Sequence, residues 1–392
     1  MEQVYIVGGA RTALGSFGGA LSTVPASRLG AAAIEGALEK SGVSGDQIDE
    51  VLMGNVLLGG QGQAPARQAC IYAGLPQGVP CVTLAKVCGS GLRTVMMAAS
   101  QVKAGDSDVV IAGGMENMTL APYALPKARN GYRMGTGEIV DLMVNDGLWD
   151  VYNNYHMGIA AELCATELNI TREQQDEFAV ASYKKALAAI EAGEFKNEIV
   201  PVNVPGRRGA VTVVDADEEP FRSKLEKIPA LRPAFKKDGT VTAANASSIN
   251  DGAAAVVVAS GAKVKELGLT AKFKIVGYAG HAQAPEWFTT APAESIKKVL
   301  GKTGLTVADI DAFEINEAFS VVSLAVNRLC ELDTAKVNLR GGAVALGHPI
   351  GASGARILVT LMSVMEDKGL KRGLASLCIG GGEAVAMIIE QV

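Results

Sequence analysis

The chain has 392 residues, a net charge of −5, 48% hydrophobic residues and 20% charged residues. This balance excludes a disordered chain, and the length predicts more than one domain, since single cores stop growing at roughly 250–300 residues. The acidic charge argues against nucleic acid as a partner, because such proteins carry a basic stripe. Glycine is frequent, at 46 residues, and aromatic residues make up only 5%, which favours closely packed α/β layers.

Membrane and metal sites are not expected. The longest apolar runs, such as 253–259, are far shorter than the ~20 residues that span a bilayer. The N-terminal segment lacks the basic region of a secretory signal, so we expect a cytoplasmic protein with no membrane partner. The cysteines show neither CxxC pairs nor zinc-like histidine spacing, so reduced thiols without disulfides or metal are expected. They are Cys70, Cys81, Cys88, Cys164, Cys330 and Cys378.

Along the chain, an internal repeat organises the predicted elements. Each half begins with an Ile-Val-Gly strand, continues with a helix, reaches a Gly-rich turn that opens a second helix, and ends in a β-rich run into glycines. The second helix of each half has apolar residues at i, i+3, i+4 and i+7. These landmarks lie at 6–8, 37–43, 88–93 and 109–114, and again at 275–277, 299–305, 351–356 and 376–381. Their common order predicts a duplicated α/β domain, each half a sheet layered with helices.

Between the halves lies a region without the repeat, at about 120–244, which we interpret as an inserted loop domain. A helix is predicted there from Thr171 to about Ala192, because Thr171 suits the N-cap and Gln174 completes a capping box. After 250–252 the chain returns to the first half as a buried strand. The predicted divisions are 1–119 completed by 245–268, then 120–244, and finally 269–392.

Cys88 is the first candidate for chemistry. It lies directly before a Gly-Ser-Gly turn that opens a helix. The N–H groups and partial positive charge of a helix N-terminus are expected to lower the pKa of this thiol and make it a nucleophile. The alternative interpretation is a buried structural cysteine.

Three further residues lie at strand ends or helix starts, where α/β proteins place their sites. His348, in a Gly- and Pro-rich turn, suits a general base, or else is a surface histidine near a helix N-cap. Cys378 ends an apolar strand before glycines 380–382, whose N–H groups can form an oxyanion hole; its alternative is a core cysteine. Asn316 can orient a water or the histidine, or cap a helix. Two thiols and an imidazole predict acyl transfer through a thioester, with the second thiol available for proton transfer.

Along nearly its whole length, the chain resembles the thiolase family, close to its biosynthetic acetyl-CoA acetyltransferase group. The nucleophile, histidine and second-cysteine motifs are together highly specific. The matching motifs are Arg11–Ala13, Val87–Gly91, Gly113–Met118, His156–Gly158, Leu231–Phe235, Asn250–Ala254, Asn316–Phe319, Gly347–Gly351 and Cys378–Gly382. The resemblance implies a duplicated, layered α-β-α-β-α fold with an inserted loop domain that covers coenzyme A.

The resemblance also implies an activity. Thiolases reversibly condense two acetyl-CoA to acetoacetyl-CoA plus CoA, or cleave a 3-ketoacyl-CoA with CoA, through an acyl-cysteine. Cys88 matches the acylated nucleophile, His348 the base that activates it, and Cys378 the acid/base for the α-proton. The N–H groups of Cys88 and Gly380 would form one oxyanion hole, and His348 with a water held by Asn316 the other.

No tightly bound cofactor is implied; CoA and acyl-CoA are substrates. Family contacts with CoA correspond to Leu148, His156, Met157, Arg222, Ala234, Phe235, Ala243, Ser247, Ala318 and Phe319. Lys227 stands where the family commonly has a CoA-contacting serine, and as a cation it suits a phosphate. Family members are dimers or tetramers. The basic residues Lys127, Arg129 and Arg133 resemble a tetramerising loop, which implies a homotetramer built as a dimer of dimers.

The chain departs from the family at two places. Trp287 and Phe288 replace a flexible Met-Gly turn beside the acyl pocket, and Glu383-Ala384 replaces a Met-Gly pair. Three alternatives therefore stay open: a degradative 3-ketoacyl-CoA thiolase of broader chain length, a ketoacyl synthase, and a non-catalytic CoA- or lipid-binding relative. Cys378 argues against the synthase, which uses a second histidine or an asparagine. The presence of all three reactive residues argues against the non-catalytic relative.

Overall fold

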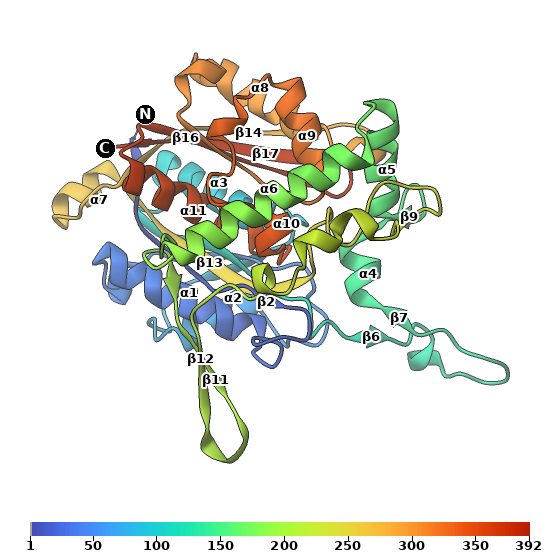
Figure 1. Cartoon of the computed structure of the whole chain (residues 1–392). Coiled ribbons are helices and arrows are strands. Elements are labelled where there is room, and N and C mark those ends of the chain that lie inside the picture. Colours follow the sequence, from blue (N-terminus) through green and yellow to red (C-terminus); the bar gives the residue numbers. More distant parts are fainter. Residues whose placement is uncertain (1) are drawn as a thin grey trace.

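The computed structural model describes residues 2–392, and one large mixed sheet dominates it (Figure 1). Its strands follow the order β15-β16-β17-β14-β1-β13-β5-β3-β4. The first half supplies β1 (Val4–Thr12), β3 (Glu50–Gly54), β4 (Cys81–Leu84), β5 (Val109–Asn117) and β13 (Asn250–Ser260). The second half supplies β14 (Phe273–Ala282), β15 (Ala312–Ile315), β16 (Arg372–Ile379) and β17 (Glu383–Gln391). Each half therefore forms its own side of the sheet.

The pairing within the two halves is the same. In the first half β1, β13 and β5 pair antiparallel and β5 pairs parallel with β3. In the second half β14, β17 and β16 pair antiparallel and β16 pairs parallel with β15. The halves meet where β1 pairs antiparallel with β14. The predicted duplication is confirmed.

The repeated Ile-Val-Gly motif has a structural reason. The register shifts between Ile6 and Gly8 in β1, and between Ile275 and Gly277 in β14. A Cβ atom at Gly8 would lie 2.7 Å from the Cβ of Ser41. A Cβ atom at Gly277 would lie 2.5 Å from the Cγ2 of Thr303. Both glycines therefore let a covering helix approach the strand closely.

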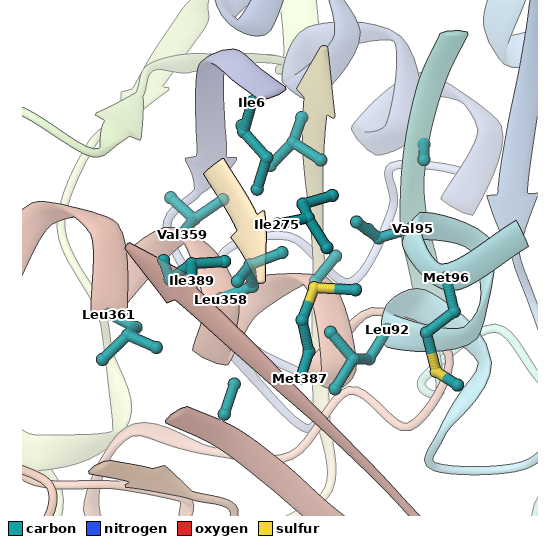
Figure 2. Close-up of a cluster of buried hydrophobic side chains, with 14 of the residues drawn as sticks. Ile6, Leu92, Val95, Met96, Ile275, Leu358, Val359, Leu361, Met387 and Ile389 are labelled. Carbon is teal, nitrogen blue, oxygen red and sulfur yellow. The ribbon is translucent and has the colours of Figure 1, made fainter. Parts of the chain in front are cut away.

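Helices cover the half-sheets in layers. Helices α3 (Ser90–Ala104) and α11 (Ser353–Lys368) contact each other and lie between the two half-sheets. Their apolar residues share one hydrophobic core with strand residues of both halves. Figure 2 shows this core, where Leu92 and Leu358 lie among strand residues such as Ile275. The outer faces carry α1 (Ala26–Ser41) and α2 (Pro65–Tyr72) in the first half, and α8 (Ala291–Thr303) and α9 (Ser320–Leu329) in the second. This is the expected α-β-α-β-α layering, and it explains why β5 and β13 are buried along their whole length.

The region between the halves contributes short hairpins and helices. Helix α6 begins where predicted, with Thr171 as N-cap and Gln174 completing the capping box. The helices of the region are α4 (Leu142–Gly147), α5 (Met157–Glu167) and α6 (Arg172–Glu191). Its strands are β6 (Tyr123–Ala124), β7 (Val140–Asp141), β8 (Trp149–Asp150), β9 (Tyr155–His156), β10 (Ile199–Val200), β11 (Val202–Pro205) and β12 (Val211–Val214). The remaining elements are β2 (Gly15–Ser16), α7 (Gly261–Glu266) and α10 (Ala343–Leu346).

Buried charges fasten this region to both halves. Arg11, in β1, lies 2.5 Å from the Glu198 carboxylate and 2.7 Å from that of Asp217. Arg340, in the second half, lies 2.8 Å from Glu194 and 3.6 Å from Glu198. Because removing one partner of a buried pair costs about 3–5 kcal/mol, these contacts hold the inserted region firmly. The three-part division of the chain stays a prediction.

Two further findings concern residues 2–392. None of their helices is both long enough and apolar enough to cross a bilayer. Among these same residues, no group of three or more His, Cys, Asp or Glu side chains is placed to hold a metal ion. All six cysteines are free thiols.

Candidate functional site

A cavity of about 230 Å³ brings together the reactive residues of both halves. Cys88 reaches it from the turn before α3, and His348 from the turn between α10 and α11. Cys378, near the end of β16, and Gly380, just beyond that strand, complete this wall. The structure thus places next to one another residues that are more than 250 positions apart in the sequence.

The turn that carries Cys88 is tightly packed and strained. Val87 has a φ of 44°, a left-handed conformation that is rare for a β-branched residue. A Cβ atom at Gly89 would lie 2.3 Å from the Cδ1 of Ile379, and one at Gly91 would lie 2.7 Å from the main-chain N of Ala355. The turn therefore presses against the end of β16 and against α11, which explains why glycines flank the cysteine. Strain of this kind is common at functional sites.

The prediction that the pKa of the Cys88 thiol is lowered is wrong. Burial raises the pKa of this thiol to about 11, although a hydrogen bond from the Gly380 main-chain N–H lowers it. The negative charge of Glu116 raises it further. Loss of water around the sulfur is the largest of these effects, although the thiol lies directly before Gly89, the N-cap of α3. At neutral pH the group is a thiol, and it needs a base to become a nucleophile.

His348 has the properties of such a base. It is 5% exposed, which excludes the alternative of a surface histidine. Burial, together with the charge of Arg356, lowers the pKa of its imidazole to about 3, so the ring is neutral at physiological pH. Its Nδ1 lies 2.6 Å from the Ser353 Oγ, and its main-chain N–H donates to the Asn250 side chain at 3.0 Å. Its Nε2 makes no hydrogen bond with any residue in 2–392.

Cys378 is both a core residue and part of the cavity wall. It is 1% exposed and pairs with Ala384 of β17. Burial raises the pKa of its thiol well above the usual value, and the nearby Cys88 raises it further. The two thiols are therefore close enough to interact, so an acyl group on one would lie near the other.

Asn316 lies behind His348 and is not part of the cavity lining. It is 1% exposed, and its Nδ2 lies 3.4 Å from the Nδ1 of His348. Its Oδ1 is buried and has no partner in the described part of the chain. Because its carboxamide is close to the imidazole and only partly hydrogen-bonded, it can still orient a polar group there.

Most of the predicted CoA contacts surround the same cavity. Its lining includes Leu148, His156, Met157, Phe235, Ser247, Ala318 and Phe319. The ring of Phe235 stacks on His156 at 4.7 Å between centroids and meets the edge of Phe319 at 6.1 Å. Phe288 also lines the cavity and meets Phe319 at 6.3 Å, whereas Trp287 is not part of the lining. The result is an apolar, aromatic cavity wall.

Three predicted contacts lie elsewhere. Ala234 and Ala243 are exposed and do not line the cavity. Arg222 is also exposed, and its Nη1 lies 3.8 Å from the Glu218 carboxylate. All three are on the surface, where they would meet only a part of a ligand that extends out of the cavity.

Sequence reasoning gave no role to three residues that shape the site: Glu116, Asn250 and Ser353. Glu116 is fully buried and accepts a hydrogen bond from the main-chain N–H of Gly351. Asn250 and Ser353 hold the main chain and the ring of His348. One signal was present in the sequence: a carboxylate in the apolar run that forms β5 must find partners, because burying it alone is costly.

Comparison with known proteins agrees with this geometry. The family model for the N-terminal domain of thiolase matches residues 4–262, and the one for the C-terminal domain of thiolase matches residues 269–391. Proteins named acetyl-CoA acetyltransferase from Cupriavidus necator and Pseudomonas aeruginosa are 55% and 52% identical over 392 residues, with full coverage of both chains. Acetyl-CoA acetyltransferase 2 of Arabidopsis thaliana is 52% identical, over 99% of this chain and 97% of its own. The chain belongs to the thiolase family.

Proposed function

We propose that this protein is an acyl-CoA C-acyltransferase that condenses two acetyl-CoA into acetoacetyl-CoA and CoA, and that also runs the reverse thiolysis. The observation that carries this proposal is one apolar cavity lined by two thiols and a neutral imidazole. The full-length relatives named acetyl-CoA acetyltransferase support the same reaction and the same CoA substrates. No tightly bound cofactor is required.

In the first half-reaction, the Cys88 sulfur attacks the thioester carbonyl of acetyl-CoA. His348 accepts the thiol proton and then gives it to the sulfur of the departing CoA, which leaves acetyl-Cys88. The pKa of Cys88 is raised and that of His348 is lowered, so a free thiolate–imidazolium pair is disfavoured. Proton transfer is therefore expected to accompany formation of the C–S bond. The main-chain N–H groups of Cys88 and Gly380 would stabilise the oxyanion.

In the second half-reaction, the thiolate form of Cys378 removes a proton from the methyl group of the second acetyl-CoA. The resulting carbanion attacks the carbonyl carbon of acetyl-Cys88 and breaks its C–S bond, which releases the Cys88 thiolate. Cys378 then gives the proton it accepted to that thiolate. A water held by Asn316 would stabilise the enolate oxygen by donating a hydrogen bond to it. The proximity of the two thiols supports this role for Cys378.

The aromatic cavity wall would hold the pantetheine arm, through Leu148, His156, Met157, Phe235, Ser247, Ala318 and Phe319. The nucleotide end would extend to the surface around Ala234, Ala243, Arg222 and Lys227, all of which are exposed. The inserted region at 120–244 supplies most of these residues and would act as the domain that covers CoA.

We also propose a homotetramer, built as a dimer of dimers. The β6–β7 segment projects from the body (Figure 1). It exposes 50% of Leu125 and 100% of Met134, beside the basic residues Lys127, Arg129 and Arg133. Light scattering should give a tetramer, and removal of 125–138 should reduce it to a dimer. A monomer would contradict the proposal.

The free thiols at the site favour a reducing compartment, so we propose the cytoplasm.

The test of the reaction is direct. Wild-type protein should cleave acetoacetyl-CoA in the presence of CoA, and Cys88→Ala should lose both directions of the reaction. Mass spectrometry after mixing with acetyl-CoA should show one acetyl group on the peptide that contains Cys88. Acetylation of a different cysteine, with Cys88 unmodified, would contradict the assignment.

A further inference from the structure

We propose that Ser353 is a positioning residue that holds His348 in its Nδ1–H tautomer, so that Nε2 keeps a lone pair for the thiol proton. The inference rests on the proposed function, since it concerns the base of that reaction. Which nitrogen of a neutral histidine carries the proton is set by the hydrogen bond made by the other nitrogen.

The geometry around Ser353 is defined by two short distances. Its Oγ lies 2.9 Å from the main-chain oxygen of Pro349 and 2.6 Å from the Nδ1 of His348. A carbonyl oxygen only accepts, and a hydroxyl has only one hydrogen. If the hydroxyl donates to Pro349, it must accept from Nδ1–H to satisfy the second contact. Ser353 is fully buried, so water does not compete for these bonds.

The repeat within the chain supports this direction. Ser90 is the first residue of α3, as Ser353 is the first residue of α11. The Ser90 hydroxyl donates to the main-chain oxygen of Val87 at 2.7 Å and accepts from the main-chain N–H of Lys86 at 2.8 Å. An amide N–H can only donate, so the direction is certain there. In the second half, the imidazole N–H of His348 takes the place of that amide.

The other neighbours of the ring do not outweigh the contact with Ser353. The Nδ2 of Asn316 is a donor and would favour an unprotonated Nδ1, but it lies 3.4 Å away, far longer than the 2.6 Å contact with Ser353. Nε2, in contrast, has no hydrogen-bond partner among the described residues. One turn beyond Ser353, the buried guanidinium of Arg356 opposes a second proton on the ring. The ring is therefore neutral, with its proton on Nδ1.

The test uses nitrogen NMR, because the chain has only three histidines. In protein labelled with 15N-histidine, the His348 signals, assigned with a His348→Asn variant, should show Nδ1 protonated and Nε2 unprotonated. Ser353→Ala should shift this signal toward the Nε2–H form and slow acetylation of Cys88 by roughly 10–100-fold, the effect of losing an orienting partner. Ser353→Thr, which restores a hydroxyl, should recover the wild-type tautomer.

The matched control is Ser90→Ala, which removes the equivalent hydroxyl of α3 and should leave the His348 signal unchanged. A wild-type spectrum with Nε2 protonated would overturn the inference, and so would an unchanged tautomer in Ser353→Ala. The wild-type spectrum decides even if a variant fails to fold. Should the tautomer be as proposed while acetyl-CoA leaves Cys88 unmodified, the proposed function fails and the role of Ser353 stands.

Discussion

Glu116 and Gly351 form a hydrogen bond that links the two halves of the chain. The carboxylate of Glu116, near the end of β5, accepts it from the main-chain N–H of Gly351 at a distance of 3.0 Å. It also accepts from the N–H groups of Val56 and Leu57, at 3.0 and 3.2 Å, and from the side chain of Asn55 at 2.7 Å. A Cβ atom at position 351 would lie 2.6 Å from this carboxylate. One buried side chain thus joins the turn before α11 to the first half.

Glu116→Gln should weaken this junction. One carboxylate oxygen would become an amide NH2 group, which cannot accept a hydrogen bond. At least one of the N–H groups that now donate to Glu116 would lose its acceptor. We expect the free energy of unfolding to fall by about 1–3 kcal/mol, the cost of leaving buried donors unpaired. Acetylation of Cys88 should slow as well, because the turn that follows His348 loses its anchor. Urea denaturation and mass spectrometry measure the two effects.

Glu39→Gln is the control for this change, since Glu39 is exposed on α1. It should alter neither stability nor acetylation. If Glu116→Gln behaved like this control, the carboxylate would not be the anchor that its contacts indicate.

The raised pKa of Cys88 predicts an unusual pH profile for its alkylation. Thiolate is the reactive form, and burial raises the pKa of Cys88 to about 11. The rate of modification by iodoacetamide should therefore still rise at roughly pH 10, beyond the ~8.5 of an ordinary thiol. Peptide mass spectrometry follows each cysteine separately.

Cys81 provides an internal reference for this measurement. A hydrogen bond from Cys70 and the nearby Arg67 lower the pKa of its thiol to about 7. Its alkylation should therefore level off near neutral pH in the same sample. A plateau for Cys88 at or below the ordinary thiol value would show that the helix field, and not burial, dominates at this site.

Cys378→Ser separates the two thiols. Transfer of acetyl to Cys88 needs the nucleophile, a base and an oxyanion hole, so the variant should still be labelled by radioactive acetyl-CoA. A serine hydroxyl is much less acidic than a thiol and moves the α-proton poorly, so condensation should fall by about 10²-fold or more. Cys330→Ser, outside the cavity, is the matched control. Near-normal condensation by Cys378→Ser would assign Cys378 to the core alone.

Phe288 is expected to limit acyl length. Its ring is 3% exposed and lines the cavity beside Phe319. The wild type should therefore cleave acetoacetyl-CoA much faster than 3-ketooctanoyl-CoA. Phe288→Ala should narrow that difference, because each additional methylene is worth ~1–3 kcal/mol in a well-fitted pocket.

Trp287→Ala is the control, since Trp287 does not line the cavity. It should preserve the wild-type ratio of the two thiolysis rates. Equal rates for both substrates in the wild type would contradict a short acyl site.

The sequence by itself determined the duplication, the buried strand that follows 250–252 and the start of α6 after Thr171. These features follow from local rules, because hydrophobic period, repeated motifs and capping residues act over a few positions. The motifs around Cys88, His348 and Cys378 also indicated which residues carry the chemistry, since their order matched the repeat.

Only the tertiary structure decided the properties of those residues. Burial between stacked layers raises the pKa of Cys88, whereas the sequence predicted a lowered pKa. Phe288 lines the cavity and Arg222 does not. The contact between Glu116 and Gly351 joins residues 235 positions apart. Desolvation and long-range pairing depend on how the half-sheets and central helices stack, and no window along the chain contains that information.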